Sequence, residues 1–201
     1  VPYGMVQLGP NNIHKGWDWC SGYHYSDSIL IGFSHTHLSG TGCIDLGDIL
    51  FRPSLQTPLA FSHSDEKASP GYYSVNLREA GVLAELTTTP HVGIHRYTYK
   101  KGIESTLVVD MDHLLDNEYI YEGWVKQTGE NELTGMRRTR GWVDNQYVFF
   151  VAQFSQPFSS MEQPSERQAV LTFDTTTGTG RYHGRRRHRS RAHEFLYGAI
   201  P

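Results

Sequence analysis

Alternation of apolar and polar residues is the clearest pattern in this chain. Residues 72–78 read YYSVNLR, with Tyr73, Val75 and Leu77 at every second position. Side chains of an extended strand point to opposite faces in turn, so this spacing predicts a β-strand with one buried face. Residues 82–88 return after a short turn and complete a predicted hairpin.

The same reasoning predicts strands along most of the chain. Residues 105–111, STLVVDM, are apolar enough for a central strand of a sheet. Polar turns separate the runs at intervals of roughly 8 to 15 residues, which is typical of antiparallel β-sandwiches. We therefore expect an all-β fold, an antiparallel, supersandwich-like β-sandwich with long loops. The further predicted strands are residues 1–12, 29–33, 49–52, 91–99, 119–126, 133–140, 147–154 and 169–173.

The last part of the chain breaks this pattern. Residues 175–191, TTTGTGRYHGRRRHRSR, hold six of the 18 Lys and Arg residues and show no alternation. We predict one domain at residues 1–174 and a disordered, Arg-rich tail at residues 175–201. Clustered Arg would suit a nucleic acid, but residues 1–176 hold 12 basic and 20 acidic residues, a net charge of −8. Because this body offers no basic surface, we favour a solvated tail or a frame-shifted reading frame, and no nucleic-acid partner.

Length and composition limit the remaining classes. A chain of 201 residues is long enough for one well-buried domain. No apolar run approaches the ~20 residues that span a bilayer, so no membrane insertion is expected. The first ten residues lack a basic segment and an apolar core, so no signal peptide is expected within this chain. Cys20 and Cys43 would pair in an oxidising compartment or stay free in a reducing one, and we favour free thiols.

Residues 16–42, GWDWCSGYHYSDSILIGFSHTHLSGTG, are the stretch richest in chemistry. They combine two Trp, three His and two Tyr with only two formal charges. Aromatic rings stack on the C–H faces of sugars, and carboxylates and imidazoles bind sugar hydroxyls. The composition therefore favours carbohydrate binding, although Trp19 and Tyr25 would suit a core equally well. The candidate rings are Trp17, Trp19, Tyr23 and Tyr25, and the candidate polar groups are Asp18, His24, His35 and His37.

Three other chemistries have weaker support. His35 and His37 would share one face of an extended segment and could bind a metal together. Neither Cys-x-x-Cys nor His-Glu-x-x-His spacing accompanies them, so we predict no metal site in this chain. A Ser-His-Asp hydrolase would lack its Gly-x-Ser-x-Gly turn, and GTG at residues 40–42 is too short for a dinucleotide fingerprint. The further metal-ligand candidates are Cys20, His24, Cys43, Asp45 and Asp48.

Several segments together resemble one known family. The segments are PYGMVQLGP at residues 2–10, the stretch at 16–42, DLGDILFRPS at 45–54, FSHSDEKASPGYYSVNL at 61–77 and HVGIHRYTY at 91–99. Together they resemble the N-terminal domain of glycoside hydrolase family 92, the exo-acting α-mannosidases, over residues 1 to about 174. The resemblance implies a fragment, an N-terminal β-sandwich whose larger C-terminal α/α-barrel is missing from this chain.

The resemblance also implies the chemistry of the complete enzyme. It would be a calcium-dependent inverting α-mannosidase, in which one carboxylic acid protonates the leaving oxygen and a carboxylate activates water. By resemblance, the acid, the base and most Ca²⁺ ligands belong to the missing barrel, so no catalytic residue is expected here. This chain would be the domain that lines the site for a mannose-containing glycan, inactive alone and secreted or periplasmic. The alternative is a stand-alone carbohydrate-binding or interaction module.

Residue by residue, the resemblance places two signatures, within residues 17–24 and 35–42, at the cleft between the domains. Trp17 and Asp18 are expected to contact mannose or the leaving sugar. The substrate-binding residues that the resemblance implies are Trp17, Asp18, Cys20, Tyr23, His24, His35, His37, Ser39 and Gly40.

Some of these residues also suit a structural role. Gly40 and Gly42 would let the backbone approach closely or adopt a positive φ. His35 and His37 would serve equally well as buried groups that fix the loops by hydrogen bonds.

Overall fold

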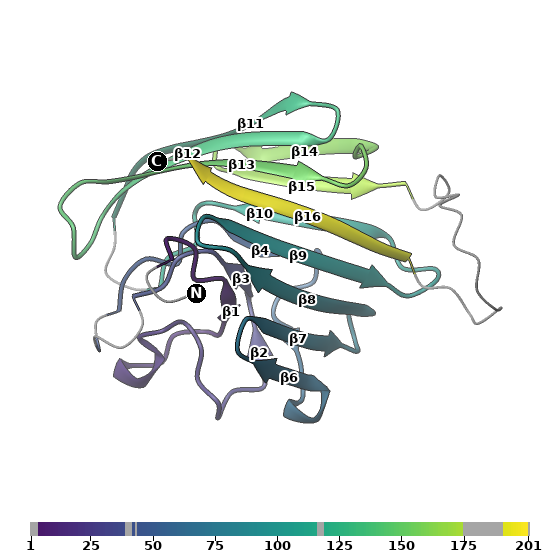
Figure 1. The fold of residues 1–201 in the computed structure, drawn as a ribbon, viewed down its shortest axis with the longest axis horizontal. Helices are drawn as coiled ribbons and strands as arrows, with labels where there is room; N and C mark the ends of the chain where they lie inside the picture. Colours follow the sequence, from purple (N-terminus) through teal and green to yellow (C-terminus); the bar gives the residue numbers. More distant parts are fainter. Residues whose placement is uncertain (1–3, 39–41, 43, 116–118, 175–190, 201) are drawn as a thin grey trace.

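The chain folds as two facing β-sheets, a sandwich (Figure 1). The computed structural model describes residues 4–38, 42, 44–115, 119–174 and 191–200, the last range by its backbone alone. Every strand pairing within these residues is antiparallel. The prediction of an all-β, antiparallel β-sandwich is confirmed.

The larger sheet has eight strands in the order β11-β12-β13-β16-β9-β8-β7-β6. Most neighbours follow one another in sequence and are joined by short turns; β16 separates β13 from β9. The strands are β6 (Glu66–Ser69), β7 (Tyr72–Leu77), β8 (Val82–Thr88), β9 (Val92–Tyr99), β11 (Tyr119–Gly129), β12 (Glu132–Arg140), β13 (Gln146–Phe154) and β16 (Arg191–Ile200).

The smaller sheet has six strands in the order β1-β3-β4-β10-β15-β14. A separate two-stranded sheet pairs β2 with β5, and two short 3-10 helices, η1 and η2, lie in the loops. The strands are β1 (Gly9–Asn11), β2 (Ile29–Leu30), β3 (Gly32–Ser34), β4 (Leu50–Arg52), β5 (Leu59–Ala60), β10 (Ser105–Asp110), β14 (Ser160–Ser165) and β15 (Gln168–Phe173), with η1 at Trp17–Trp19 and η2 at His63–Asp65.

The core lies between the two sheets and is rich in aromatic rings. Strand β13 shows the alternation that builds it, because every second side chain from Val148 to Phe154 is buried and those between face outward. Facing rings such as Phe33 and Phe51 come from the smaller sheet. As expected for a central strand, β10 lies between β4 and β15 and buries all but its last residue.

Two strands that the alternation pattern missed lie at sheet edges. Strand β6 reads EKAS and β14 reads SMEQPS, and neither is among the predicted strands. Most of their side chains are exposed. An edge strand in contact with solvent does not need an apolar face, so the alternation that marks a half-buried strand is absent from its sequence.

The C-terminal part of the chain differs from the predicted tail. Residues 191–200 form β16, which pairs with β13 on one side and with β9 on the other. The boundary placed after residue 174 is therefore not the end of the sheet. The segment AHEFLYGAI that follows the Arg-rich run contains aromatic and aliphatic residues suited to a strand. Most of the Arg-rich run itself, residues 175–190, lies outside the described residues.

Candidate functional site

The stretch richest in chemistry lies at one end of the sandwich, at the left of Figure 1, together with the turn between β12 and β13. Residues 36 and 47 are joined by a backbone hydrogen bond, and His37 pairs with Leu46 as an isolated bridge. The backbone N–H of Trp142 in the β12–β13 turn donates to Asp45 Oδ2 at 2.5 Å. Segments far apart in sequence therefore share this end of the fold.

Trp17 and Asp18 are both exposed and lie in η1. The indole of Trp17 is 69% exposed and packs on Gly42, where a Cβ atom would come within 2.8 Å of Trp17 Cζ2. Gly42 also has a φ of +69°, a conformation that favours glycine. Both expectations for Gly42 are confirmed, whereas Ser39, Gly40 and Cys43 lie outside the described residues.

Trp19 is half-buried and anchored by the acid of the same loop. Its indole N–H donates to Asp27 Oδ2 at 2.5 Å, and Lys15 donates to the same carboxylate. Burial acts to raise the pKa of Asp27, but the hydrogen bonds from Lys15 and Trp19 outweigh it and hold that pKa below its usual value. Asp27 therefore stays charged and fixes the ring.

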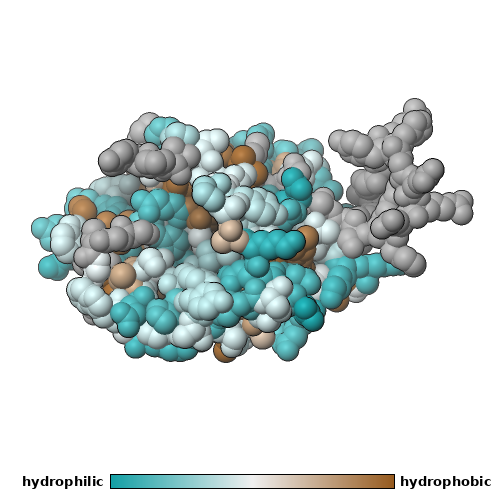
Figure 2. All heavy atoms as spheres, turned by 60° about the horizontal axis from the view of Figure 1, so that its bottom comes forward, coloured by the Kyte–Doolittle hydropathy of each residue, from teal (hydrophilic) through white to brown (hydrophobic). Residues whose placement is uncertain are grey.

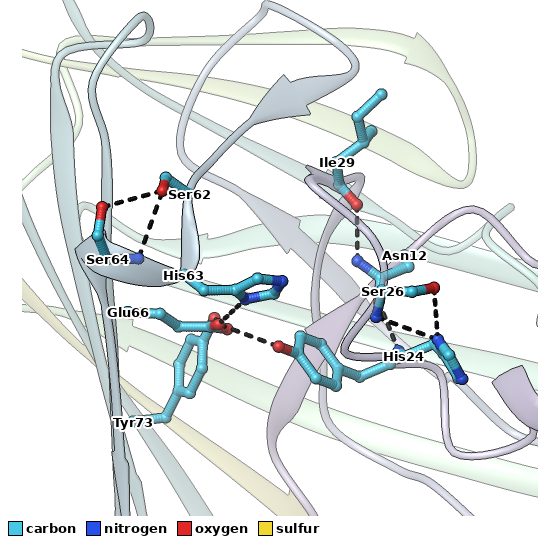
Figure 3. A network of polar contacts seen from close by, with 10 residues as sticks. Asn12, His24, Ser26, Ile29, Ser62, His63, Ser64, Glu66 and Tyr73 are labelled. Carbon is cyan, nitrogen blue, oxygen red and sulfur yellow. Dashed lines mark hydrogen bonds and ion pairs between the residues drawn. The ribbon is translucent and has the colours of Figure 1, made fainter.

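His24 lies against the exposed side of this loop. Its ring stacks on Trp19, with centroids 4.2 Å apart and planes at 25°. Its backbone N–H donates to Asn12 Oδ1 at 2.7 Å, and Nδ1 lies 2.8 Å from Ser26 Oγ (Figure 3). Nearby, Cys20 is half-buried and a free thiol.

Tyr23 points in the opposite direction, toward η2 and the larger sheet. Its hydroxyl donates to Glu66 Oε2 at 3.0 Å. Burial, together with this carboxylate, raises the pKa of Tyr23 above its usual value, so the phenol stays protonated and acts as a donor. The hydroxyl of Tyr23 is thus engaged with the protein.

His37 is buried within the loops. Its Nδ1 lies 2.6 Å from the Gln7 carbonyl oxygen, and its Nε2 lies 2.8 Å from Asn11 Oδ1 and 3.0 Å from Ser34 Oγ. Gly22 packs on the same ring, where a Cβ would come within 2.8 Å of Nε2. This ring holds the segment before β1, the end of β1, the end of β3 and the loop around Gly22 together.

His35 is buried on the other side, inside the core. Its Nδ1 lies 2.7 Å from the Ile49 carbonyl oxygen, and its Nε2 lies 2.8 Å from Nε2 of His95 on β9. Desolvation lowers the pKa of His35 to about 3, and the pKa of His37 is also lowered, mainly by burial. Both rings remain neutral near pH 7 and fix the loops from inside.

An ion pair beneath the loops connects the two sheets. Arg137 on β12 and Asp48, just before β4, have fully buried side chains, with Nε and Oδ1 3.3 Å apart. The other oxygen of Asp48 accepts hydrogen bonds from Thr36 at 2.7 Å and Gln146 at 2.8 Å. Arg137 also donates to the His113 carbonyl oxygen at 2.6 Å.

Comparison with known proteins identifies the family. Residues 1–193 match the model of the glycosyl hydrolase family 92 N-terminal domain. The chain belongs to this family. The match covers the residues on which the resemblance rested and continues past residue 174.

Solved structures of family 92 enzymes have the same fold. An α-mannosidase of Bacteroides thetaiotaomicron in complex with mannoimidazole superposes with a TM-score of 0.83 at 27% identity, covering 98% of this chain and 29% of that chain. An inverting mannosidase of Bacteroides thetaiotaomicron VPI-5482 superposes with a TM-score of 0.73 at 22% identity, covering 99% of this chain and 27% of its own. The second likeness shows the fold alone.

A curated relative points the same way. It is an uncharacterized secreted glycosidase of Arthroderma benhamiae, 27% identical over 138 residues, which are 58% of this chain and 18% of that protein. The chain thus spans less than a third of the length of each of these relatives. Within the described residues, no helix is long and apolar enough to cross a membrane.

Several residues that shape the site were not predicted from the sequence. Glu66 lies in a segment that carried the resemblance, but nothing in its spacing connects it with Tyr23. His95 and Arg137 lie on strands, and the alternation of β9 places His95 opposite Ile94 and Arg96, on the face that turns out to be buried. The available signal for His95 was its place in one alternating set with Tyr97 and Tyr99, which are also buried.

The buried ion pair gives a first prediction. Arg137→Met leaves Asp48 buried without its cation, so the free energy of unfolding should fall by about 3–5 kcal/mol. Arg140→Met is the matched control on the same strand, because Arg140 is 62% exposed and its contact with Asp144 is 3.9 Å long, and its effect should stay within about 0.5 kcal/mol. Urea denaturation measures both. Equal, small losses in the two variants would contradict the structural role of the pair.

The buried histidines give a second prediction, on pH. His35 stays neutral in the folded state, with a pKa of about 3, whereas in the unfolded chain it takes up a proton near its ordinary pKa of about 6.5. The unfolded state therefore binds more protons below that pH, and stability should fall as the pH drops from about 6.5 toward about 3. Each such histidine costs about 1.4 kcal/mol per pH unit in this window.

Urea denaturation at pH 8, 6 and 5 checks this dependence. The free energy of unfolding of His35→Asn should depend less steeply on pH between 6 and 5 than that of the unsubstituted chain. The value at pH 8 measures the packing loss alone and serves as the reference. An identical slope in both proteins would show that His35 is protonated in the folded state.

Proposed function

We propose that this chain is the substrate-lining N-terminal domain of an exo-acting, inverting α-mannosidase that depends on calcium. The observation that carries the proposal is the exposed indole of Trp17, held on Gly42 at the loop end of a family 92 domain. The relative solved with mannoimidazole, at 27% identity, supports mannose-containing glycans as substrates. The part of the relatives that this chain does not span would supply the larger catalytic domain.

The exposed groups suit recognition of a sugar. The ring of Trp17 offers an apolar face for the C–H side of a mannose residue, and the neighbouring Asp18 offers a charged acceptor for hydroxyls. His24 presents its imidazole from the same loop, stacked on Trp19. Buried His35 and His37 would support these contacts by keeping the loops in place.

The acid and the base of the proposed reaction belong outside this chain. An inverting glycosidase needs two carboxyl groups roughly 6.5–9.5 Å apart on opposite sides of the scissile bond. At this end of the described structure, the buried carboxylates Asp27, Asp45 and Asp48 accept hydrogen bonds from the protein. Asp18 is exposed, and the other carboxylate of residues 16–42, Asp27, is buried, so Asp18 has no second exposed carboxylate from this stretch to act with it. We therefore assign this chain to binding and expect it to be inactive alone.

Calcium does not fit the described residues of this chain. Ca²⁺ takes six to eight oxygen ligands, usually with several carboxylates. Within the described ranges, no group of three or more His, Cys, Asp and Glu side chains is placed to hold a metal. Any calcium site of the proposed enzyme would therefore draw most of its ligands from the domain outside this chain. Secretion, proposed from the secreted relative, places the enzyme where it meets glycans.

A stand-alone carbohydrate-binding module is the second candidate. It is favoured by the exposure of Trp17 and Tyr25, which are 69% and 70% accessible. The two candidates differ in affinity. A module that works alone should bind a glycan with a Kd in the micromolar range, whereas one wall of a cleft should bind the same sugar in the millimolar range.

Hydrolysis tests the proposed function. The purified 201-residue chain should release no mannose from α-mannobiose, while a complete family 92 α-mannosidase assayed beside it does. The coding DNA downstream of this chain, read in three frames, should encode the remaining domain, and the protein that includes it should release mannose. Turnover by the 201-residue chain alone would overturn the assignment to binding.

Substitution of Trp17 tests the proposed binding surface. Trp17→Ala should raise the Kd for α-mannobiose, measured by NMR titration, about tenfold, which corresponds to ~1.4 kcal/mol. Tyr147→Ala is the control, because Tyr147 is a 46% exposed ring on β13, in the larger sheet. Equal effects of the two substitutions would argue against a specific role for Trp17.

A further inference from the structure

Tyr25 is both highly exposed and firmly supported. Its side chain is 70% accessible. One face of its ring stacks on the imidazole of His63 in η2, with centroids 4.1 Å apart and planes at 16°. His63 itself packs edge-on against buried Phe61, at 5.3 Å between centroids. The ring is therefore held from one side and open on the other.

Glu66 fixes this support from below. Its side chain is 9% exposed, and its carboxylate is hydrogen-bonded to three groups. These are His63 Nδ1 at 2.8 Å, the Tyr23 hydroxyl at 3.0 Å and the Tyr73 hydroxyl at 2.5 Å (Figure 3). Hydrogen bonds to a charged acceptor are strong, and losing one leaves a buried lone pair unsatisfied. The loop of Tyr23 and Tyr25, the η2 turn and strand β7 are thereby locked to one carboxylate.

The residues next in sequence to Tyr25 and to His63 carry hydroxyl groups. Ser26 follows it and lies 2.8 Å from the His24 ring, while Ser62 and Ser64 flank His63 with their hydroxyls 2.9 Å apart. Figure 3 shows Ser62 and Ser64 close to His63 and Glu66, with Ser26 and His24 on the other side of the view. In Figure 2, which brings the bottom of Figure 1 forward, hydrophobic side chains form small separate patches in a mostly hydrophilic surface.

This environment suits a sugar better than a protein partner. A protein interface needs a buried apolar centre with several neighbouring hydrophobic groups. A hexopyranose needs one flat ring for its C–H face and hydrogen-bonding groups around the rim. Tyr25 provides the ring, and exposed serines stand next in sequence to it and to the His63 that supports it, namely Ser26, Ser62 and Ser64.

We propose that Tyr25, supported by His63 and Glu66, is a second sugar-stacking platform, which binds a neutral hexopyranose residue of the glycan. Glu66 is a positioning residue that acts through His63 and does not touch the sugar. The inference rests on the proposed function, because it requires that this chain bind a glycan. It reassigns the aromatic contact of this loop from Tyr23, whose hydroxyl is bound to Glu66, to Tyr25.

Titration of the 201-residue chain with α-mannobiose, followed by NMR, tests the platform. The ring resonances of Tyr25 should shift as the sugar is added. Tyr25→Ala should raise the Kd about fivefold and His63→Ala about threefold, whereas Tyr25→Phe, which keeps the stacking face, should restore the affinity. Tyr73→Phe is the matched control, since it removes one hydrogen bond to Glu66 but leaves His63 in place, and its Kd should stay within about twofold.

Each result separates this inference from the proposed function. Unshifted Tyr25 resonances at saturating sugar, or an unchanged Kd in Tyr25→Ala while Trp17→Ala weakens binding, would overturn the platform and leave the proposed function standing. The proposed function is judged on hydrolysis by the complete enzyme. Thermal denaturation shows whether the exposed substitution Tyr25→Ala leaves the fold intact, as its accessibility predicts.

Discussion

A fully buried ion pair between Asp48 and Arg137 is the interaction on which this end of the fold depends. Arg137 belongs to the larger sheet and Asp48 precedes a strand of the smaller one, so the pair ties the two layers together. Two buried charges are costly unless they are paired and hydrogen-bonded. Thr36 and Gln146 provide the further bonds, and they bring the loop after β3 and the start of β13 to the same point.

The buried histidines extend this polar framework toward the surface. His37 joins Gln7, Asn11 and Ser34, and His35 reaches His95 across the core. Long loops without regular structure would otherwise be the least ordered part of the molecule. Here, buried side chains supply the constraint that a sheet ladder supplies elsewhere. The loops that carry exposed aromatic rings are thus held in place by buried polar side chains.

Local patterns in the sequence were sufficient to predict strands that have one or both faces buried. Alternation located strands such as β7, β8 and β13, and the apolar run of β10 identified a central strand. It failed at β6 and β14, where an edge position removes the need for an apolar face. Residues 191–200 lie between β9 and β13 and pair with both, although these strands are distant in sequence. Local sequence does not show which distant strands a segment pairs with.

In the candidate site, too, the sequence predicted individual residues but not their partners. Composition and resemblance singled out Trp17 and its neighbours, and the close approach at Gly42 followed from the glycine itself. The partners of these residues could not be predicted, because contacts such as Tyr23 with Glu66 or Asp45 with Trp142 join segments that only the folded chain brings together. Exposure divides the residues further, since Tyr25 presents its ring to solvent and His35 is buried completely.

The central proposal is that buried polar groups hold the loop of Trp17 for contact with a glycan, and that Tyr25, stacked on His63 of η2, is a second ring for it. A crystal structure of this chain with α-mannobiose tests it most directly. A hexopyranose should lie stacked on the indole of Trp17, with the loops at Gly42 and His37 unchanged from the sugar-free protein. A sugar bound elsewhere, such as over the exposed rings of β11 and β13, would contradict it.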